Sequence, residues 1–186
     1  NNRPVEEIVQ EKLKYSPASN YPTKLRDMAF NLLRTNDSII QIEYIRADKK
    51  YNKVLKTYAS NEINIYSNYF NTDTCFKLID KDIAYLNNGS LKRKYLPEIW
   101  KSIEQTKGLI IDNRNYPSDF PIYDLSNYLM PESTPYVKFT SGSKETPGLF
   151  TFGKSINVGK KNKSYYKGKV IILVNEISQS SAEFHA

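Results

Sequence analysis

Hydrophobic positions in the first sixty residues follow two different periods. Apolar side chains recur at helical spacing over residues 5–13 and again from 23 to 33, which predicts two amphipathic helices. Between 40 and 47 they alternate, which predicts a strand. A turn at 48–50 and a returning strand at 54–58 would complete a hairpin.

After residue 75 the pattern changes to short apolar runs that alternate with helical segments. Gly108–Asp112 and the run at 170–174 are continuous and apolar, which is typical of strands buried on both faces. We also expect strands at 76–80, 83–86, 136–140 and 149–153, and helices at 91–105 (restarting at Pro97) and 124–130. Strands that alternate with helices predict an α/β unit with a partly parallel sheet.

Composition excludes several classes of site. Hydrophobic residues make up 39% of the 186 positions and charged residues 25%, which is typical of a folded core rather than a disordered chain. The single cysteine, Cys75, excludes an internal disulfide, and a single histidine excludes the commonest zinc sites. No apolar run reaches the roughly 20 residues of a membrane span. We expect no metal, cofactor or membrane span.

The net charge of +7 raises the question of nucleic-acid binding. Six lysines lie between Lys154 and Lys169, around a pair of tyrosines. A recognisable nucleic-acid module is absent from the sequence, so we interpret this stretch as a solvated loop and expect no nucleic-acid partner.

A serine-rich turn follows the apolar run at 170–174. Ser180-Ser-Ala-Glu183 has the spacing of a capping box, in which Ser180 caps a helix and Glu183 reaches back to its backbone. The same position suits a nucleophile, because unpaired N–H groups and the positive end of a helix dipole can stabilise an oxyanion. The spacing leaves both roles open, and they do not exclude each other.

Two motifs resemble those of the carboxyl-terminal processing (tail-specific) serine peptidases. The segment KGLIIDNRNYP at 107–117 is similar to the family's KGLIIDLRNNPGG stretch. Residues 166–183 are similar to the nucleophile segment, in which a strand ending in LVN precedes a Ser/Ala-rich turn and a Ser-x-x-Glu. The resemblance spans 76–186 and implies a ClpP/crotonase-like fold, a partly parallel sheet with helices. The fold would be incomplete, with 75–186 as the N-terminal part of a peptidase core.

The start of the chain resembles a PDZ domain, a module that accompanies these peptidases. NRPVEEI at 2–8 is similar to the turn that leads into a late PDZ helix, and the hairpin at 38–58 is similar to the closing strands. The resemblance implies that 1–60 is the C-terminal half of a PDZ-like α+β domain with an extra helix. Residues 61–74 would be a linker. PDZ domains capture the C-termini of their ligands by strand addition.

The peptidase resemblance also implies roles for individual residues. Ser180 matches the nucleophile, with Ser178 and Ser181 as alternatives, and the Ser181 N–H would hold the oxyanion.

A second oxyanion donor would come from the bend after Asp112, where the family has two glycines that this chain lacks. Pro117 has no N–H, which leaves Ser118 or Asp119. Arg114 matches the motif's arginine and would fix the bend through a charge-assisted hydrogen bond.

In this family a lysine beyond the serine commonly activates it, and another branch uses a histidine and a glutamate. The chain ends six residues beyond Ser180, so the family's lysine falls outside it. His185 stands at i+5, about 140° around a helix from Ser180, so its ring is expected to point away. Phe152-Gly-Lys154 mimics the lysine motif but precedes the serine. We expect the isolated chain to be catalytically inactive.

The sequence therefore predicts a fragment of an extracytoplasmic (periplasmic or cell-envelope) serine endopeptidase that works through an acyl-enzyme on Ser180. Its partners would be protein or peptide substrates, and an open sheet edge would favour self-association. A non-catalytic peptide-binding protein is the alternative, because the glycine turn is altered. Acyl-CoA chemistry on a crotonase-like fold is a third hypothesis, but no CoA pocket is evident in the sequence.

Overall fold

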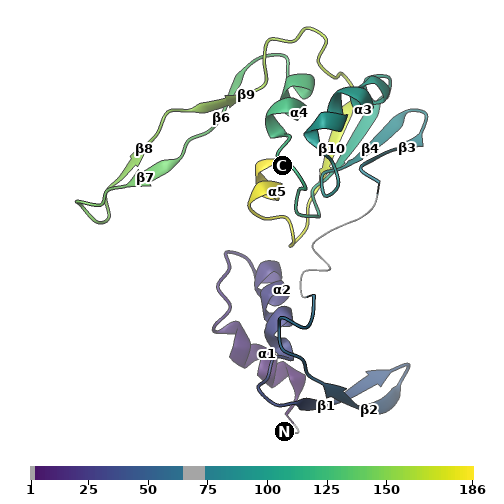
Figure 1. The fold of residues 1–186 in the computed structure, drawn as a ribbon, viewed down its shortest axis with the longest axis vertical. Coiled ribbons are helices and arrows are strands. Elements are labelled where there is room, and N and C mark those ends of the chain that lie inside the picture. Colours follow the sequence, from purple (N-terminus) through teal and green to yellow (C-terminus); the bar gives the residue numbers. More distant parts are fainter. Residues whose placement is uncertain (1–2, 65–73) are drawn as a thin grey trace. The chain divides into compact units, whose positions relative to one another are not determined.

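The chain forms two compact units in the computed structural model, Asn1–Tyr69 and Phe70–Ala186 (Figure 1). The structure describes residues 3–64 and 74–186. The division between the units falls within the predicted linker at 61–74, most of which lies outside the described residues.

Two helices begin the first unit, α1 (Val5–Leu13) and α2 (Tyr21–Leu32). Helix α2 starts earlier than the apolar pattern predicts, because the side chain of Asn20 accepts a 2.9 Å hydrogen bond from the Thr23 N–H and so caps the helix. At the other end of α2, Lys12 donates to the Leu32 carbonyl and so satisfies a terminal acceptor. Met28 is the one buried side chain among the described residues of this unit.

A hairpin completes the first unit, with β1 (Ile39–Arg46) paired antiparallel to β2 (Lys49–Lys56). The predicted turn at 48–50 is wrong, because Lys49 and Lys50 already pair with β1. The connection consists of Ala47 and Asp48, with φ of 49° and 59°. Two positive φ angles define the tight turn that matches the twist of paired strands.

The second unit is built on a four-stranded sheet in the order β10-β5-β4-β3. Its strands are β3 (Phe76–Asp80), β4 (Ile83–Asn87), β5 (Gly108–Asp112) and β10 (Lys169–Leu173). Strands β4, β5 and β10 run parallel, and β3 is antiparallel to β4. The predicted α/β unit with a partly parallel sheet is confirmed.

Two helices cover one face of this sheet, α3 (Leu96–Ile103) and α4 (Ile122–Leu129). The predicted helix at 91–105 is shorter than expected: a 3₁₀ turn at Arg93–Tyr95 precedes α3, which begins just before Pro97. Trp100 of α3 stacks on Tyr128, with ring centroids 4.5 Å apart. The buried core consists of Ala84, Leu86, Leu91, Leu96, Trp100, Ile103, Leu109, Ile111, Leu125 and Tyr166, with Cys75 packed against it.

The prediction that the run at 170–174 is buried is wrong. Val170 is 40% exposed and Ile171 55%. Strand β10 lies at the edge of the sheet, and no other described strand pairs with its outer side. An apolar run therefore faces solvent on a strand whose hydrogen-bonding edge is open.

An arm of two short ribbons extends from this unit (Figure 1). Its strands are β6 (Thr134–Val137), β7 (Thr140–Gly142), β8 (Phe150–Phe152) and β9 (Ile156–Val158), paired as β6-β9 and β7-β8. The single strand expected at 136–140 is divided between β6 and β7, and β9 falls inside the stretch interpreted as a loop. The short helix α5 (Ser181–Phe184) follows β10.

No helix in the described ranges 3–64 and 74–186 is long and apolar enough to cross a membrane.

Truncation of the core should destabilise the second unit far more than truncation at its surface. Leu86 of β4 is fully buried, so Leu86→Ala is expected to lower the free energy of unfolding by about 2–5 kcal/mol. Leu78 of β3 is 48% exposed, so the control Leu78→Ala should cost about 1 kcal/mol or less. Urea unfolding followed by Trp100 fluorescence measures both. Equal losses of unfolding free energy in the two variants would contradict the placement of Leu86 in the core and of Leu78 at the surface.

Candidate active site

The turn between β10 and α5 is held by three hydrogen bonds onto one residue. Asn175 accepts at its carbonyl from the Ser178 N–H and at its side chain from the Ile177 N–H, both at 3.0 Å. Its own N–H donates to the Ser178 hydroxyl, also at 3.0 Å. The chain therefore reaches Ser180 from a closed turn rather than from a free loop.

Ser178 also joins this turn to the bend after β5. Its hydroxyl donates to the Asn113 carbonyl at 2.8 Å, and the Asn113 N–H donates to the Leu173 carbonyl at 2.9 Å. The two sequence motifs, 65 residues apart at these positions, thus meet at the carboxyl ends of neighbouring parallel strands. In open α/β sheets this edge is where ligands bind.

Ser180 lies in the open and in an unusual backbone conformation. Its φ is 54° and its ψ is −115°, and the residue is exposed. Its N–H donates to the Glu183 carboxylate at 2.9 Å, in agreement with the spacing of the capping box. A positive φ at a residue other than glycine costs about 1–3 kcal/mol and persists only where neighbours enforce it. Such strain at a strand-to-helix turn is typical of nucleophile elbows.

The two predicted oxyanion donors differ in their hydrogen bonding. Ser181 is the first residue of α5, and its N–H makes no hydrogen bond to a described residue. The Ser118 N–H instead donates to the Asn88 carbonyl at 3.0 Å. The role predicted for Ser118 would require that bond to break. The Asp119 N–H, the alternative, has no acceptor in the described part of the chain.

Arg114 holds the carboxylate at the end of β5. It donates to both oxygens of Asp112, at 3.0 and 2.7 Å, and the Tyr85 hydroxyl donates to the same carboxylate at 2.6 Å. The Asp112 side chain is only 3% exposed. Burial raises its pKa, but the hydrogen bonds from Arg114 and Tyr85 outweigh burial, so the net shift is downward. Burial and the bond to Asp112 raise the pKa of Tyr85 to about 12.

Three buried asparagines lie beside this bend, and sequence reasoning missed them. Asn87, Asn88 and Asn113 are fully buried, and the Asn88 amide donates to the Asn113 side-chain oxygen at 2.6 Å. Asn87 Nδ2, Asn88 Oδ1 and Asn113 Nδ2 have no hydrogen-bond partner among the described residues. Each residue stands at or just after the end of a parallel strand, and that position was the available signal.

His185 does not serve Ser180 as a base in this arrangement. Its Nδ1 is 2.6 Å from the Ser181 carbonyl, so the ring folds back against the first turn of α5. Its Nε2 is buried and has no hydrogen-bond partner in the described part of the chain, and burial lowers the pKa of the ring. No Lys, His, Asp or Glu side chain within 3–64 or 74–186 hydrogen-bonds to the Ser180 hydroxyl.

Aromatic rings from three segments gather around the end of α5. We call this set the aromatic cluster; it consists of Phe120, Tyr123, Tyr136, Phe139 and Phe184. His185 packs edge-on against Phe120. Scattered single aromatics carry no periodic signal, so the sequence did not predict the cluster.

The described residues contain no group of three or more His, Cys, Asp or Glu side chains that could hold a metal ion.

The burial of His185 predicts a pH dependence of stability. Because the folded-state pKa is lowered from 6.5, the unfolded chain binds more protons below that pH, and stability falls as pH drops. In His185→Phe this contribution is absent. The free energy of unfolding of the wild type relative to the variant should therefore decrease between about pH 7 and about pH 5. Urea titrations of both proteins across this range measure the difference. If the unfolding free energies of the wild type and of His185→Phe change with pH in parallel, the prediction for His185 is wrong.

The chain is similar to the crystal structure of a "putative peptidase" from Parabacteroides merdae ATCC 43184, with 14% sequence identity and a TM-score of 0.45. The match covers 100% of this chain and 64% of that one, so the chain spans less than two thirds of that protein's length. No protein-family model and no curated protein matches the chain.

Proposed function

We propose that the protein is a serine endopeptidase of the carboxyl-terminal processing type, with Ser180 as its nucleophile. The observation that supports this most directly is the conformation of Ser180. The residue is exposed, it follows a parallel strand, and it holds a φ of 54° between a tied turn and α5. A strained conformation of this kind is maintained at functional sites because it aims a side chain outward.

In this proposal the Ser180 hydroxyl attacks a peptide carbonyl and forms an acyl-enzyme, and the Ser181 N–H stabilises the developing oxyanion. The second donor comes from the bend near Ser118 or Asp119. A lysine or histidine outside this chain takes the proton of the hydroxyl, since no described side chain hydrogen-bonds there. The reaction requires no cofactor.

Replacement of the nucleophile tests the proposal in the full-length protein. Ser180→Ala should reduce hydrolysis of an unfolded protein substrate by at least about 10³-fold, because no acyl-enzyme can form. Ser181→Ala keeps its backbone amide and should lose less than about tenfold. Fragments are quantified by gel and mass spectrometry. A Ser180→Ala protein that cleaves at the wild-type rate would remove the proposal.

The contact between Ser178 and Asn113 should affect turnover rather than binding. Without the hydroxyl in Ser178→Ala, the turn is no longer tied to the bend, and kcat should fall about 10–100-fold with KM little changed. Ser178→Thr retains a hydroxyl and should keep most of the activity. Steady-state kinetics at a temperature where all variants are folded decide this. Equal activity of the alanine and threonine variants would show that the bond does not position Ser180.

One observation favours a second candidate, a non-catalytic peptide-binding protein on the same fold. The Ser118 amide, one of the two predicted oxyanion donors, is bonded to the Asn88 carbonyl. Peptide binding without any Ser180-dependent cleavage would identify this alternative.

The remaining expectations extend the proposal to the whole protein. Residues 1–60 would be the C-terminal half of a PDZ-like domain, a role compatible with a hairpin that has one open edge on each strand. The peptidase core would have a ClpP/crotonase-like topology and act outside the cytoplasm on protein or peptide substrates. The open edge of β10 would favour self-association of this chain.

A further inference from the structure

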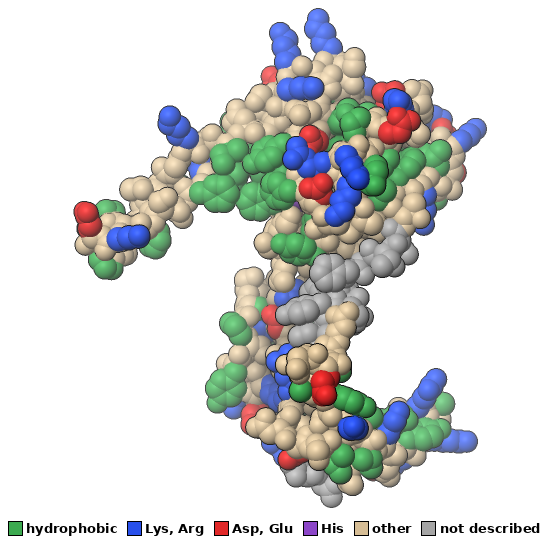
Figure 2. Space-filling view, in the orientation of Figure 1, with side chains coloured by type: hydrophobic (Ala, Val, Ile, Leu, Met, Phe, Trp, Pro, Cys, Tyr) green, Lys and Arg blue, Asp and Glu red, His purple; other side chains and the backbone are tan. Residues whose placement is uncertain are grey.

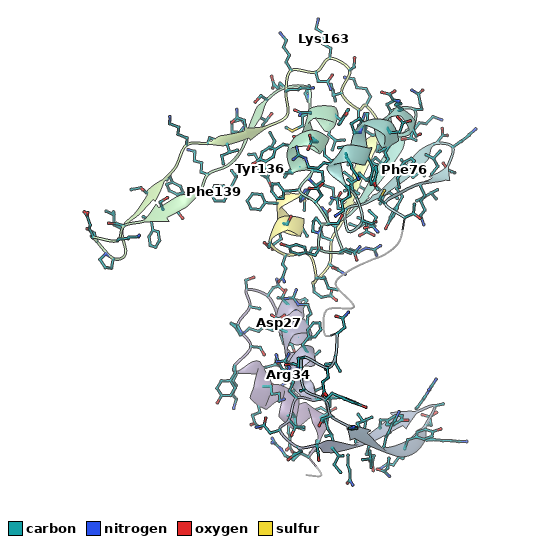
Figure 3. The ribbon with its side chains drawn as sticks, viewed as in Figure 1. Asp27, Arg34, Phe76, Tyr136, Phe139 and Lys163 are labelled. Carbon is teal, nitrogen blue, oxygen red and sulfur yellow. The ribbon has the colours of Figure 1, made fainter. Side chains whose placement is uncertain are left out.

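The aromatic cluster is organised around Phe184, which belongs to the helix that Ser180 begins. Phe139 stacks on Phe184 with ring centroids 6.0 Å apart and planes 11° apart. Tyr136 of β6 and Phe120 approach the same ring, at 5.9 and 6.2 Å. In Figure 3, Tyr136 and Phe139 are labelled where the arm meets the rest of this unit.

These rings remain largely accessible although they touch one another. Phe139 is 52% exposed, Phe120 38% and Tyr136 38%. Single exposed apolar side chains are ordinary, but a contiguous group of them marks a binding site. Figure 2 shows apolar side chains gathered where the arm joins the body of this unit.

The cluster is tied to Ser180 through the backbone of a short helix. The Phe184 N–H donates to the Ser180 carbonyl at 3.1 Å, and α5, which joins the two residues, is only four residues long. The Tyr136 hydroxyl donates to the Phe184 carbonyl, which holds β6 against α5. The position of the rings relative to Ser180 is therefore set by bonded contacts and not by a free loop.

We propose that the aromatic cluster binds a bulky apolar side chain of the peptide substrate, beside the bond that Ser180 attacks. This inference rests on the proposed function and names its substrate class: peptides with an aromatic or branched aliphatic residue near the cleaved bond. Aromatic walls suit such side chains, because large flat rings bury much apolar area and stack edge-to-face or offset.

The arm itself provides a reason to choose a single side chain as the occupant and not a second copy of the protein. Phe150 and Phe152 are the most exposed rings of the arm, at 65% and 76%. They pair with Gly142 and Thr140, and among the described residues neither ring makes a ring contact with the five rings of the cluster. Five rings are far fewer than the roughly 20–30 residues that each partner contributes to a stable protein–protein interface.

The test measures peptide binding on the Ser180→Ala background of the full-length protein, where bound peptide is not consumed. The probes are short fluorescent peptides of serine, glycine and asparagine in which one phenylalanine is moved from position to position. We expect the best-placed phenylalanine to tighten binding about tenfold over the peptide without it. Phe139→Ala and Phe184→Ala should abolish this preference, measured by fluorescence anisotropy.

Phe152→Ala is the matched control, since it removes an exposed phenylalanine ring of the same arm that makes no ring contact with the cluster among the described residues. It should leave the preference unchanged. Phe139 is half exposed, so its truncation leaves the core intact, and circular dichroism melting verifies this. Equal binding of all peptides, or a preference that survives Phe139→Ala in a folded protein, would overturn the inference.

The outcome for the cluster and the outcome for the peptidase proposal can be distinguished. A phenylalanine preference that depends on Phe139, in a protein that never cleaves peptides, would keep the subsite and reject the hydrolase. Cleavage that depends on Ser180 but does not depend on a phenylalanine in the peptide would keep the hydrolase and reject the subsite.

Discussion

The parallel pairing of β5 with β10 is the constraint on which the candidate site depends. Leu173 lies opposite Asp112 in this register, so both chains leave the sheet at the same edge. The bend after Asp112 and the turn after Leu173 then meet through the Asn113 N–H and the Ser178 hydroxyl. A change in this register would separate the bend from Ser180, because each would leave the sheet at a different level.

Strain and charge at this edge are stabilised by different means. The positive φ of Ser180 is held by local bonds, from its N–H to Glu183 and from the Phe184 N–H to its carbonyl. The buried carboxylate of Asp112 is held by Arg114 and Tyr85, and removal of one partner from such a group typically costs 3–5 kcal/mol. The bend is thus rigid on the β5 side, while the serine remains exposed to solvent. Rigid support of an exposed reactive group is the arrangement that nucleophilic catalysis requires.

Much of the fold follows from patterns that are local in the chain. The strand Gly108–Asp112 was predicted with its observed bounds, because a run of apolar β-formers between polar turns is compatible with few alternatives. The bond from Ser180 to Glu183 follows from their spacing of three residues. The exposure of Val170 and Ile171 could not be read in this way. The sequence of an apolar strand can be the same at the edge of a sheet as at its centre. Only the neighbouring strands determine whether its side chains are buried.

The features of the candidate site can also be separated into those that the sequence predicts and those that depend on tertiary contacts. The sequence by itself determined the serine at a strand-to-helix turn and the arginine beside Asp112, since these depend on residue type and short spacing. Tertiary structure alone decided that the Ser118 amide is bonded to Asn88, that three asparagines are buried together and that rings from the arm surround Phe184. These contacts join residues far apart in the chain, and their partners are chosen by the packing of whole elements, which no local pattern encodes.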